Sequence, residues 1–577
     1  MKVIVLGGGV AGMSAAQELA ERDFEVVVYE TRAIPGGKAR SMPVPGSGTG
    51  GRPDLPAEHG FRFFPGFYRH LPDTMQRIPF GGGGSVLSNL VDTSKVQLAL
   101  EGRAEIITPS HFPASLDDLE LAFSSLLAQA TALGVPPEDQ AHFVNRLLLL
   151  LTSCEERRFA EYEHQSWWEF SGAKTRSAAY GKLLADGLTR TLVAAKAREM
   201  SARTGGTILL QLLFDLARPG HQVDRVLNGP TNDVWIDPWL EHLRSKELGV
   251  DYQTEHQVQA IHYSDGKVTG VSIVHHGRRF DDTADFYVAA VPVEVMRLLA
   301  TDEIKQAEPR LGGLNCLRTR WMNGVMFYLD RDVSVVHGHS LYIDSPWALT
   351  SISQAQFWRD VDLKQLGDGR VEGILSVDVS DWEAQGGNGK QAMYCSTEEV
   401  CDEVWTQLKK SLNDAGIGVL EDANRLRCFL DPDIVYPNPT AAENLEPLLV
   451  NTVGSWGNRP EATTAIENLF LASDYVRTHT DLATMEGANE AARRAVNGIL
   501  ERSGSNQPRC SLWRLGEPAI FAPARALDRA LFALHQPPQL AVSAKEDGRI
   551  ERSELVSLGG ELASLGASVA GRISRLL

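Results

Sequence analysis

The stretch KVIVLGGGVAGMSAAQELAERDFEVVVYE, residues 2–30, decides the fold of the N-terminal part of the chain. The apolar run at 3–6 is typical of a buried strand, and small and apolar side chains then recur at helical spacing. These helical positions are Ala15, Ala16, Leu19 and Ala20. A second predicted strand, at 25–29, follows. The order strand, glycine-rich turn, helix and strand predicts the start of a parallel α/β sheet.

Three glycines lie between the first strand and the helix. Gly7, Gly9 and Gly12 form the pattern GxGxxG, which permits a tight turn and lets a pyrophosphate approach the N–H groups of the helix N-terminus. Glu30 follows the second strand, where a carboxylate accepts hydrogen bonds from ribose hydroxyls and repels a 2′-phosphate. Because all these parts occur in register, the stretch predicts a dinucleotide site.

Two further segments extend this site. The loop GGKARS, residues 36–41, places two glycines and two cations close to the pyrophosphate turn, which is unusual for a simple surface loop. Near the other end, a short strand at 469–472 precedes Asp474, and Met485 begins a long amphipathic helix. A helix N-terminus can stabilise negative charge on a flavin ring. We therefore expect Asp474 at a ribityl or pyrophosphate group, and the helix at the flavin end.

The segment AEHGFRFFPGFYRHLPDTM, residues 57–75, combines aromatic rings with fixed positive charge. In one interpretation its rings lie along a flavin and substrate channel, and His59 and Arg62 supply charge or hydrogen bonds near the redox centre. In the other, the phenylalanines belong to the core and the cations are solvated.

Together these motifs resemble the flavin amine oxidase superfamily over roughly residues 1–502, and within it the phytoene desaturase branch, which is related to hydroxysqualene dehydroxylases. The resemblance implies that Glu58–Phe64 runs beside the flavin ring, that Thr484–Ala488 closes over its pyrimidine edge, and that Val258 contacts the adenine through its backbone. The implied catalytic residues are His59 and Arg62. The implied FAD-binding residues are Gly7, Gly9, Val10, Ala11, Gly12, Glu30, Gly37, Lys38, Ala39, Arg40, His59, Gly60, Phe61, Arg62, Val258, Asp474, Met485, Glu486, Gly487 and Ala488.

The length, charge and cysteine pattern exclude several classes of protein. A chain of 577 residues exceeds one core, and a net charge of −18 argues against nucleic acid as a partner. The six cysteines form no CxxC pair, so we expect reduced thiols, no disulfide and no zinc site. The pairs His275-His276 and His337-x-His339 are expected at the surface, and we predict no metal site.

We expect an α/β fold in which a discontinuous Rossmann-type FAD-binding domain is joined to an α+β substrate domain with a helical subdomain. The middle of the chain fits this, because leucine and alanine recur at helical spacing between 100 and 222, as in Leu116, Leu119, Phe123, Leu126 and Leu127. The predicted parts are 1–99, 223–300 and 451–502 for the FAD-binding domain, 100–222 for the helical subdomain, 301–450 for the substrate-domain sheet, and 503–577 for a C-terminal extension.

The longest apolar runs, 147–151 and 208–213, are far shorter than the roughly 20 residues of a membrane span. With no cleavable signal expected before Val3, we predict a cytoplasmic protein that can lie on a membrane surface. The extension supplies an amphipathic helix at 521–534, with Phe521, Leu527, Leu531 and Leu534 on its apolar side. It either packs back on the protein or lies on a bilayer.

The leading function is dehydrogenation of a hydrophobic isoprenoid-like substrate by FAD, with hydride passing to flavin N5. One alternative is an amine oxidase, in which Trp456 is a possible ring facing the flavin. Another is a non-redox isomerase or a structural flavoprotein. Because one GxGxxG alone has the full context, no nicotinamide domain is expected, and the electron acceptor is oxygen or a membrane quinone.

Overall fold

The computed structural model describes residues 1–99, 101, 106–108, 134–187, 195–215, 224–333, 335–413, 418–438, 441–540, 542–545 and 550–552. Contacts along the chain divide it into two compact units. The first comprises residues 1–107, 224–451 and 455–515, and the second comprises 108–223, 452–454 and 516–577. The predicted helix positions 116–127 lie outside the described residues.

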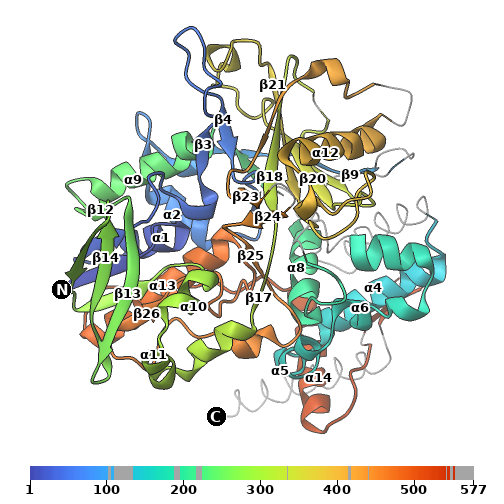
Figure 1. Ribbon diagram of the computed structural model, residues 1–577. Helices are drawn as coiled ribbons and strands as arrows, with labels where there is room; N and C mark the ends of the chain where they lie inside the picture. The colour runs from blue at the N-terminus through green and yellow to red at the C-terminus, as the bar shows by residue number, and fades with distance from the viewer. Residues whose placement is uncertain are drawn as a thin grey trace. The chain divides into compact units, whose positions relative to one another are not determined.

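The first unit is built on a parallel sheet of five strands in the order β12-β2-β1-β16-β26. Figure 1 labels its two edge strands, β12 and β26. These strands are β1 (Lys2–Leu6), β2 (Glu25–Tyr29), β12 (Asp251–Gln253), β16 (Phe286–Ala289) and β26 (Leu469–Leu471). In chain order the arrangement is 3-2-1-4-5, that of a Rossmann-type sheet. The strands come from three separate stretches of the chain, as a discontinuous domain requires.

Helices pack around this sheet and join its distant segments. They are α1 (Val10–Ala20), α2 (His70–Arg77), α9 (Asp237–Arg244), α10 (Val293–Leu299), α11 (Asp302–Ala307) and α13 (Met485–Ser503). Asn489 of α13 donates to the hydroxyls of Ser14 on α1 and Thr74 on α2, at 2.8 and 2.9 Å. Trp239 of α9 donates to Gln17 of α1 at 2.7 Å. These buried bonds fix the helices that carry the predicted motifs.

Small antiparallel sheets complete the dinucleotide side of the unit. One of them is a meander of β13 (His256–Ser264), β14 (Lys267–His275) and β15 (Arg278–Asp282). The other strands pair as β3 (Ser41–Pro43) with β4 (Pro56–Glu58), β5 (Phe64–Pro65) and β8 (Leu90–Asp92) with β11 (Asp224–Leu227), β6 (Pro79–Phe80) with β7 (Gly84–Ser85), β17 (Arg318–Arg320) with β25 (Leu448–Val450), and β23 (Ile434–Asn438) with β24 (Ala441–Asn444).

A seven-stranded sheet forms the rest of the first unit, in the order β10-β9-β19-β20-β21-β18-β22. Its strands are β9 (Lys95–Ala99), β10 (Ile106–Thr108), β18 (Asn323–Leu329), β19 (Gly338–Tyr342), β20 (Leu349–Ser353), β21 (Gly373–Val379) and β22 (Arg425–Leu430). One face packs on α12 (Thr397–Leu412), which begins with a capping box between Ser396 and Glu399. The opposite face packs on β3, β4 and Phe61.

The second unit is mainly helical. It contains α4 (Pro137–Thr152), α5 (Glu155–Ala160), α6 (Trp167–Phe170), the π-helix Tyr180–Gly187, α8 (Ala202–Asp215), α14 (Ala522–Ala533) and the strands β27 (Val542–Ala544) and β28 (Ile550–Arg552). Trp167 is buried, and Arg198 lies over the ring of Trp168 at 3.7 Å. The ring of Trp167 stacks on that of Phe170, with centroids 5.8 Å apart, although its Nε1 has no hydrogen-bond partner among the described residues.

The extension does not form one segment. Residues 503–515 pack on the first unit, where the N–H of Trp513 donates to Nε2 of His70, whereas α14 packs on α4 and α5. Phe521 is buried and Leu527 and Leu531 are half-buried, as predicted, but Leu534 is 69% exposed and was wrongly assigned to the apolar side. No helix among the described residues has the length and apolar character needed to cross a membrane.

Two other expectations were wrong. Cys401 of α12 and Cys428 of β22 form a disulfide, although neither lies in a CxxC pair, because helix packing brings together residues 27 apart in sequence. His339 is buried, since its position on β19 faces the aromatic segment, with Phe61 and Phe63 ring centroids at 5.1 and 4.9 Å.

Candidate functional site

The turn between β1 and α1 leaves the start of the helix open. Gly9, the N-cap residue of α1, makes no side-chain cap hydrogen bond, and the leading N–H groups of the helix include those of Val10 and Ala11. A Cβ on Gly12 would lie 1.9 Å from the carbonyl oxygen of Gly7, so no larger residue fits there. The turn therefore has the bare backbone and helix N-terminus that a pyrophosphate needs.

Glu30 lies against this turn, at the end of β2. Its Oε2 accepts a hydrogen bond from the N–H of Gly8 at 2.7 Å, and its Oε1 accepts one from the N–H of Arg32 at 2.8 Å. Burial raises the pKa of this carboxyl, and the two N–H groups oppose that rise. Tyr252, which sequence reasoning missed, donates its hydroxyl to the carbonyl of Gly8 at 2.7 Å and so fixes the turn from the other side.

The loop GGKARS adjoins the same turn, with the N–H of Gly36 donating to the carbonyl of Gly8 at 3.3 Å. Residues 37–39 form a 3₁₀ turn in which Ala39 is buried. Lys38 is half-buried, with its Nζ 3.4 Å from Glu294. Arg40 is not a free cation for a ligand, because it forms ion pairs with Asp433 and with Glu446, the latter at 3.0 Å.

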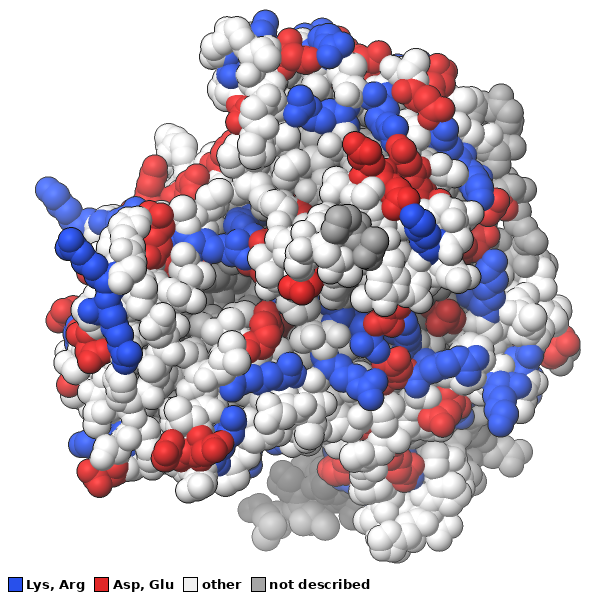
Figure 2. All heavy atoms as spheres, viewed as in Figure 1, with Lys and Arg blue, Asp and Glu red and all other residues white. Residues whose placement is uncertain are grey.

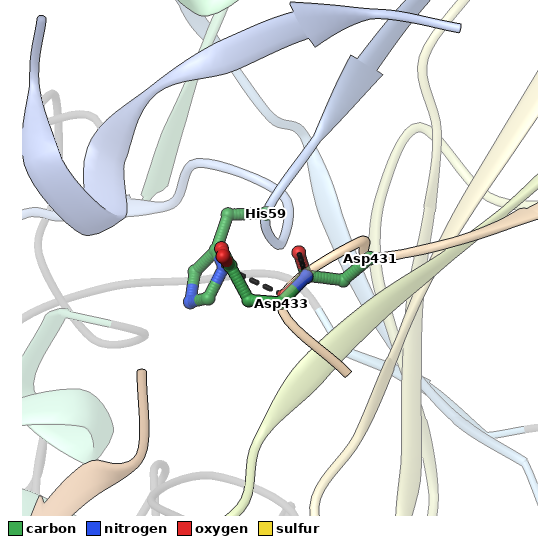
Figure 3. A group of neighbouring side chains, drawn as sticks. All are labelled: His59, Asp431 and Asp433. Atoms are coloured by element: carbon green, nitrogen blue, oxygen red, sulfur yellow. Dashed lines mark hydrogen bonds and ion pairs between the residues drawn. The ribbon is translucent and has the colours of Figure 1, made fainter. Parts of the chain in front are cut away.

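His59 lies in a buried charge network (Figure 3). Its Nδ1 is 2.7 Å from Oδ2 of Asp431 and 3.7 Å from Oδ2 of Asp433, although the closer contact is not aligned as a hydrogen bond. Burial acts to raise the pKa of Asp431, but His59 and the hydrogen bonds from Asn323 and the Asp433 N–H outweigh it and hold the pKa below its usual range. The three residues have the donor atoms of a metal site, all within 4.8 Å. Arg32 and Arg40 already neutralise Asp433, so we interpret the group as a salt-bridge network.

Glu58 is a buried carboxyl held by Thr231. Burial raises its pKa to about 7, although Arg62 and the Thr231 hydrogen bonds oppose the rise. Arg62 lies with its Nε 3.8 Å from Glu58, and its terminal nitrogen donates to the carbonyl of Lys38 at 2.9 Å. Arg62 therefore ties the aromatic segment to the GGKARS loop.

Gly60 and Phe61 lie against β21 of the seven-stranded sheet. A Cβ on Gly60 would be 2.8 Å from Oδ1 of Asp378, so glycine permits this close approach. Burial raises the pKa of Asp378 to about 7, and Arg62 and His59 oppose the rise. The segment 57–64 thus joins β21 to the dinucleotide side of the unit.

Asp474 follows β26 and is half-buried, with the Ser473 hydroxyl 3.2 Å from its Oδ1. The buried Arg459 holds the loop by donating to the backbone carbonyls of Asp474, Tyr475 and Val476. Burial raises the pKa of the Glu294 carboxyl. The positive charge of Lys38 opposes this rise, and the negative charge of Asp474 adds to it. Val258 is half-buried on β13, where the pairing with β14 shifts register.

The segment MEGA forms the first turn of α13. Thr484 caps it by accepting the N–H of Gly487 at 3.1 Å, and Met485 and Ala488 are half-buried. The carboxylate of Glu486 accepts hydrogen bonds from the N–H groups of Arg69, His70 and Leu71 at the start of α2. These bonds occupy the carboxylate, so it is not available to a cofactor. It joins the MEGA segment to residues 57–75.

These contacts bring together every predicted motif of the first unit: the GxGxxG turn, Glu30, the GGKARS loop, residues 57–64, Asp474 and the start of α13. The residues missed from sequence are Thr231, Tyr252, Asp378, Asp431, Asp433 and Glu446. The run LDPDIVY at 430–436 was the one available signal, since it places two acids beside a strand.

The arrangement fits a dinucleotide with a flavin. It offers an uncapped helix N-terminus for a pyrophosphate, a buried carboxyl at the end of β2 for ribose hydroxyls, and a second helix start at α13. Asp and Glu side chains lie among the Lys and Arg side chains on the face that Figure 2 shows. That mixture does not resemble the basic face of a nucleic-acid-binding protein.

Comparison with known proteins also indicates a flavin-binding protein, over most of the chain. The family model described as flavin containing amine oxidoreductase matches residues 10–500. The zeta-carotene desaturase of Synechocystis sp. is 24% identical over 534 residues, which cover 87% of this chain and 97% of the relative. The 15-cis-phytoene desaturase of Synechococcus elongatus is 21% identical over 525 residues, or 89% of this chain and 98% of the relative.

Solved structures share the fold. Wild-type putrescine oxidase bound to putrescine aligns with a TM-score of 0.56 at 14% identity, over 86% of this chain and 99% of its own. Cyclohexylamine oxidase from Brevibacterium oxydans aligns with a TM-score of 0.56 at 14% identity, over 87% of this chain and 99% of its own. At this identity the likeness establishes the fold alone.

Proposed function

Because the chain belongs to the flavin-containing amine oxidoreductase family and is a flavin-dependent oxidoreductase, we propose that it uses FAD to dehydrogenate a hydrophobic, carotenoid-like isoprenoid. The position of Glu30 is the main evidence for FAD as the cofactor. Its buried carboxyl beside Gly8 suits the ribose of an adenine dinucleotide, a group that FMN lacks. The names of the two desaturase relatives, which match nearly the whole chain, support the substrate class.

The residues of the site have separate roles in this proposal. The α1 N-terminus would hold the pyrophosphate, Glu30 the adenine ribose, Asp474 the ribityl or pyrophosphate side, and the start of α13 the flavin end. When bound, FAD would supply the hydride acceptor, at its N5, for the substrate carbon. His59 is the candidate that holds the proton released from the neighbouring carbon, because Asp431 faces its Nδ1 and stabilises the charged ring.

Amine oxidation is the second candidate, because the fold is that of putrescine oxidase. It would need an aromatic ring free to face the flavin. The Trp456 ring already has the guanidinium groups of Arg459 and Arg477 at 5.7 and 5.3 Å from its centroid. This contact does not favour Trp456 as a substrate wall.

We also propose that the electron acceptor is a quinone or oxygen, and that the protein is cytoplasmic and contacts membranes peripherally. A quinone shares the apolar phase of an isoprenoid substrate, which supports its choice. Flotation of the purified protein with phospholipid vesicles tests the membrane contact, and protein that stays in the dense fraction contradicts it.

The identity of the cofactor and substrate is tested by extraction. Heat-released cofactor should have the mass of FAD, and organic extraction of the freshly purified protein should yield an isoprenoid by mass spectrometry. Released FMN, or a protein with no flavin after expression in a riboflavin-sufficient host, would refute the proposal.

A further inference from the structure

Several buried polar side chains on one face of the seven-stranded sheet have no hydrogen-bond partner. Among the described residues, no group bonds to Oγ1 of Thr350, Oγ of Ser376 or Oδ1 of Asp378, although the backbone N–H of Phe61 acts on the Asp378 carboxyl. These residues are 1%, 0% and 7% exposed, so bulk water does not satisfy them either. Buried polar atoms in proteins nearly always have a partner, and leaving one without a partner costs free energy. Three such atoms together leave hydrogen-bonding capacity that a bound polar group or a water molecule can satisfy.

The three atoms lie on one patch. Thr350 of β20 is directly opposite Asp378 of β21 in the antiparallel pair, so both side chains share a face. Ser376 is two residues from Asp378 on the same strand and therefore points to the same face. His339, whose Nε2 also lacks a partner, lies two strands from Ser376 on this face.

On the opposite face of the same strands, the hydroxyl of Ser351 does have a hydrogen-bond partner. Ser351, which adjoins Thr350, is 1% exposed and its hydroxyl lies 2.9 Å from the hydroxyl of Tyr342. That face packs on α12. The buried Nε2 of Gln97 on β9 also lacks a partner among the described residues, so what distinguishes the patch is that its three atoms lie together.

The patch faces the aromatic segment that belongs to the proposed site. Oδ1 of Asp378 is 2.8 Å from the position that a Cβ on Gly60 would take, and the rings of Phe61 and Phe63 contact His339. Arg62 and His59 act electrostatically on Asp378. A group bound at the patch would therefore lie beside residues 59–63.

The chemistry of the patch selects its ligand. Two hydroxyls and a carboxyl can both donate and accept hydrogen bonds, which matches an O–H group. A pure hydrocarbon would leave all three atoms without partners. An ammonium group is disfavoured, because the guanidinium of Arg62 already acts on Asp378 and repels a second cation.

We propose that Thr350, Ser376 and Asp378 form a subsite for a hydroxyl group of the substrate, so that the substrate is an isoprenoid alcohol rather than a pure hydrocarbon. This inference rests on the proposed function, because it takes an isoprenoid as the substrate. It adds a polar recognition element to a site otherwise expected to be apolar.

The test compares two probes that differ in a hydroxyl, farnesol and the hydrocarbon β-farnesene, in the same nonionic detergent. Their Kd values for the flavin-loaded protein are measured by isothermal titration calorimetry. Wild-type protein should bind farnesol about tenfold more tightly, the effect of one or two satisfied hydrogen bonds. Ser376→Ala and Thr350→Val should each bring the two Kd values closer together. The matched control is Ser351→Ala, which removes a partnered hydroxyl on the adjacent strand and should leave the ratio unchanged.

Other results would overturn the inference. Equal Kd values for both probes in flavin-loaded wild-type protein contradict the subsite while leaving the proposed flavin chemistry intact. An unchanged ratio in Ser376→Ala and Thr350→Val, with a larger fall in melting temperature than in Ser351→Ala, means that the patch holds structural water instead. Binding of neither probe contradicts the isoprenoid substrate, and the subsite fails with it.

Discussion

Thr231 holds both oxygens of the Glu58 carboxyl: its N–H donates to Oε1 at 3.0 Å and its hydroxyl donates to Oε2 at 2.8 Å. The two residues are 173 positions apart in the chain, and both are buried. The following residue, Asn232, similarly binds Ser41, its N–H donating to the Ser41 hydroxyl at 2.7 Å. The segment 231–232 therefore fixes the start of the aromatic segment and the end of the GGKARS loop at once.

The buried Glu58 gives the protein a pH-dependent stability. Its folded pKa of about 7 lies above its ordinary value of 4.5, so between these values the folded state keeps a proton that the unfolded state loses. The stabilisation of the folded state by this proton is fully present below about pH 4.5 and is lost as pH rises through 7. The loss in the free energy of unfolding is up to about 3 kcal/mol. Glu58→Gln should unfold like wild type at pH 5 and be more stable than wild type at pH 8, by urea denaturation.

Asp378 titrates in the same direction, because burial raises its pKa to about 7 as well. The single change Glu58→Gln should therefore remove only part of the pH dependence, and the double variant with Asp378→Asn should remove more. Equal losses of stability from pH 5 to pH 8 in wild type and Glu58→Gln would show that Glu58 ionises normally.

Flavin retention should depend on Glu30 and Asp474. Glu30→Gln and Asp474→Asn each weaken a charge-assisted hydrogen bond worth about 1.5–3 kcal/mol, so the flavin Kd should rise about tenfold or more in each. The ratio of flavin to protein after dialysis measures this. Glu25→Gln, at an exposed position of the same strand β2, is the matched control. If the variant with both substitutions keeps its full flavin content after dialysis, the assignment of the flavin site is wrong.

The disulfide between Cys401 and Cys428 predicts a thiol count. Of the six cysteines, Cys154, Cys316, Cys395 and Cys510 are free. Protein unfolded without reductant should give four reactive thiols, and six after reduction. Loss of a disulfide that closes a loop of 27 residues should cost about 2–4 kcal/mol, so Cys428→Ser should unfold at lower urea. Six thiols before reduction would restore the expectation from sequence.

The extension should be needed for the stability of the helical unit. Asp528 of α14 is buried and accepts bonds from Nε of Arg157 at 3.0 Å and from the N–H of Cys154 at 2.8 Å. Asp528→Ala leaves Arg157, which is 1% exposed, without this partner, and should cost about 3–5 kcal/mol. Arg529→Ala removes an exposed ion pair one residue away and should change the melting temperature little. Similar melting curves for the two variants would mean that α14 does not hold this unit.

Much of the dinucleotide side could be predicted because its signals are local. Strands β1, β2 and β26 and the helix starts at Val10 and Met485 follow from apolar runs and glycines that are adjacent in sequence. The meander β13–β14 follows from its turn at 264–267 in the same way. The family match over residues 10–500 agrees with that reading.

The partners of the charged residues could not be predicted, because they come from distant strands. Arg40 was assigned to the cofactor, but Asp433 and Glu446 bind it from segments about 400 residues away. Glu486 was assigned likewise, but it caps α2. A sequence shows which residues carry charge, whereas ion pairs between segments depend on the tertiary fold.

The central claim is that the bound flavin dehydrogenates an isoprenoid. Its most direct test is to add candidate substrates without oxygen and to monitor flavin reduction by the absorbance near 450 nm. We predict bleaching by an isoprenoid substrate extracted from the protein, reoxidation by a soluble quinone, and no bleaching by putrescine, NADH or NADPH. Turnover of the isoprenoid without net flavin reduction would make the protein an isomerase. Bleaching by putrescine would make it an amine oxidase, and rapid bleaching by NADPH would reveal a nicotinamide site that contradicts the account.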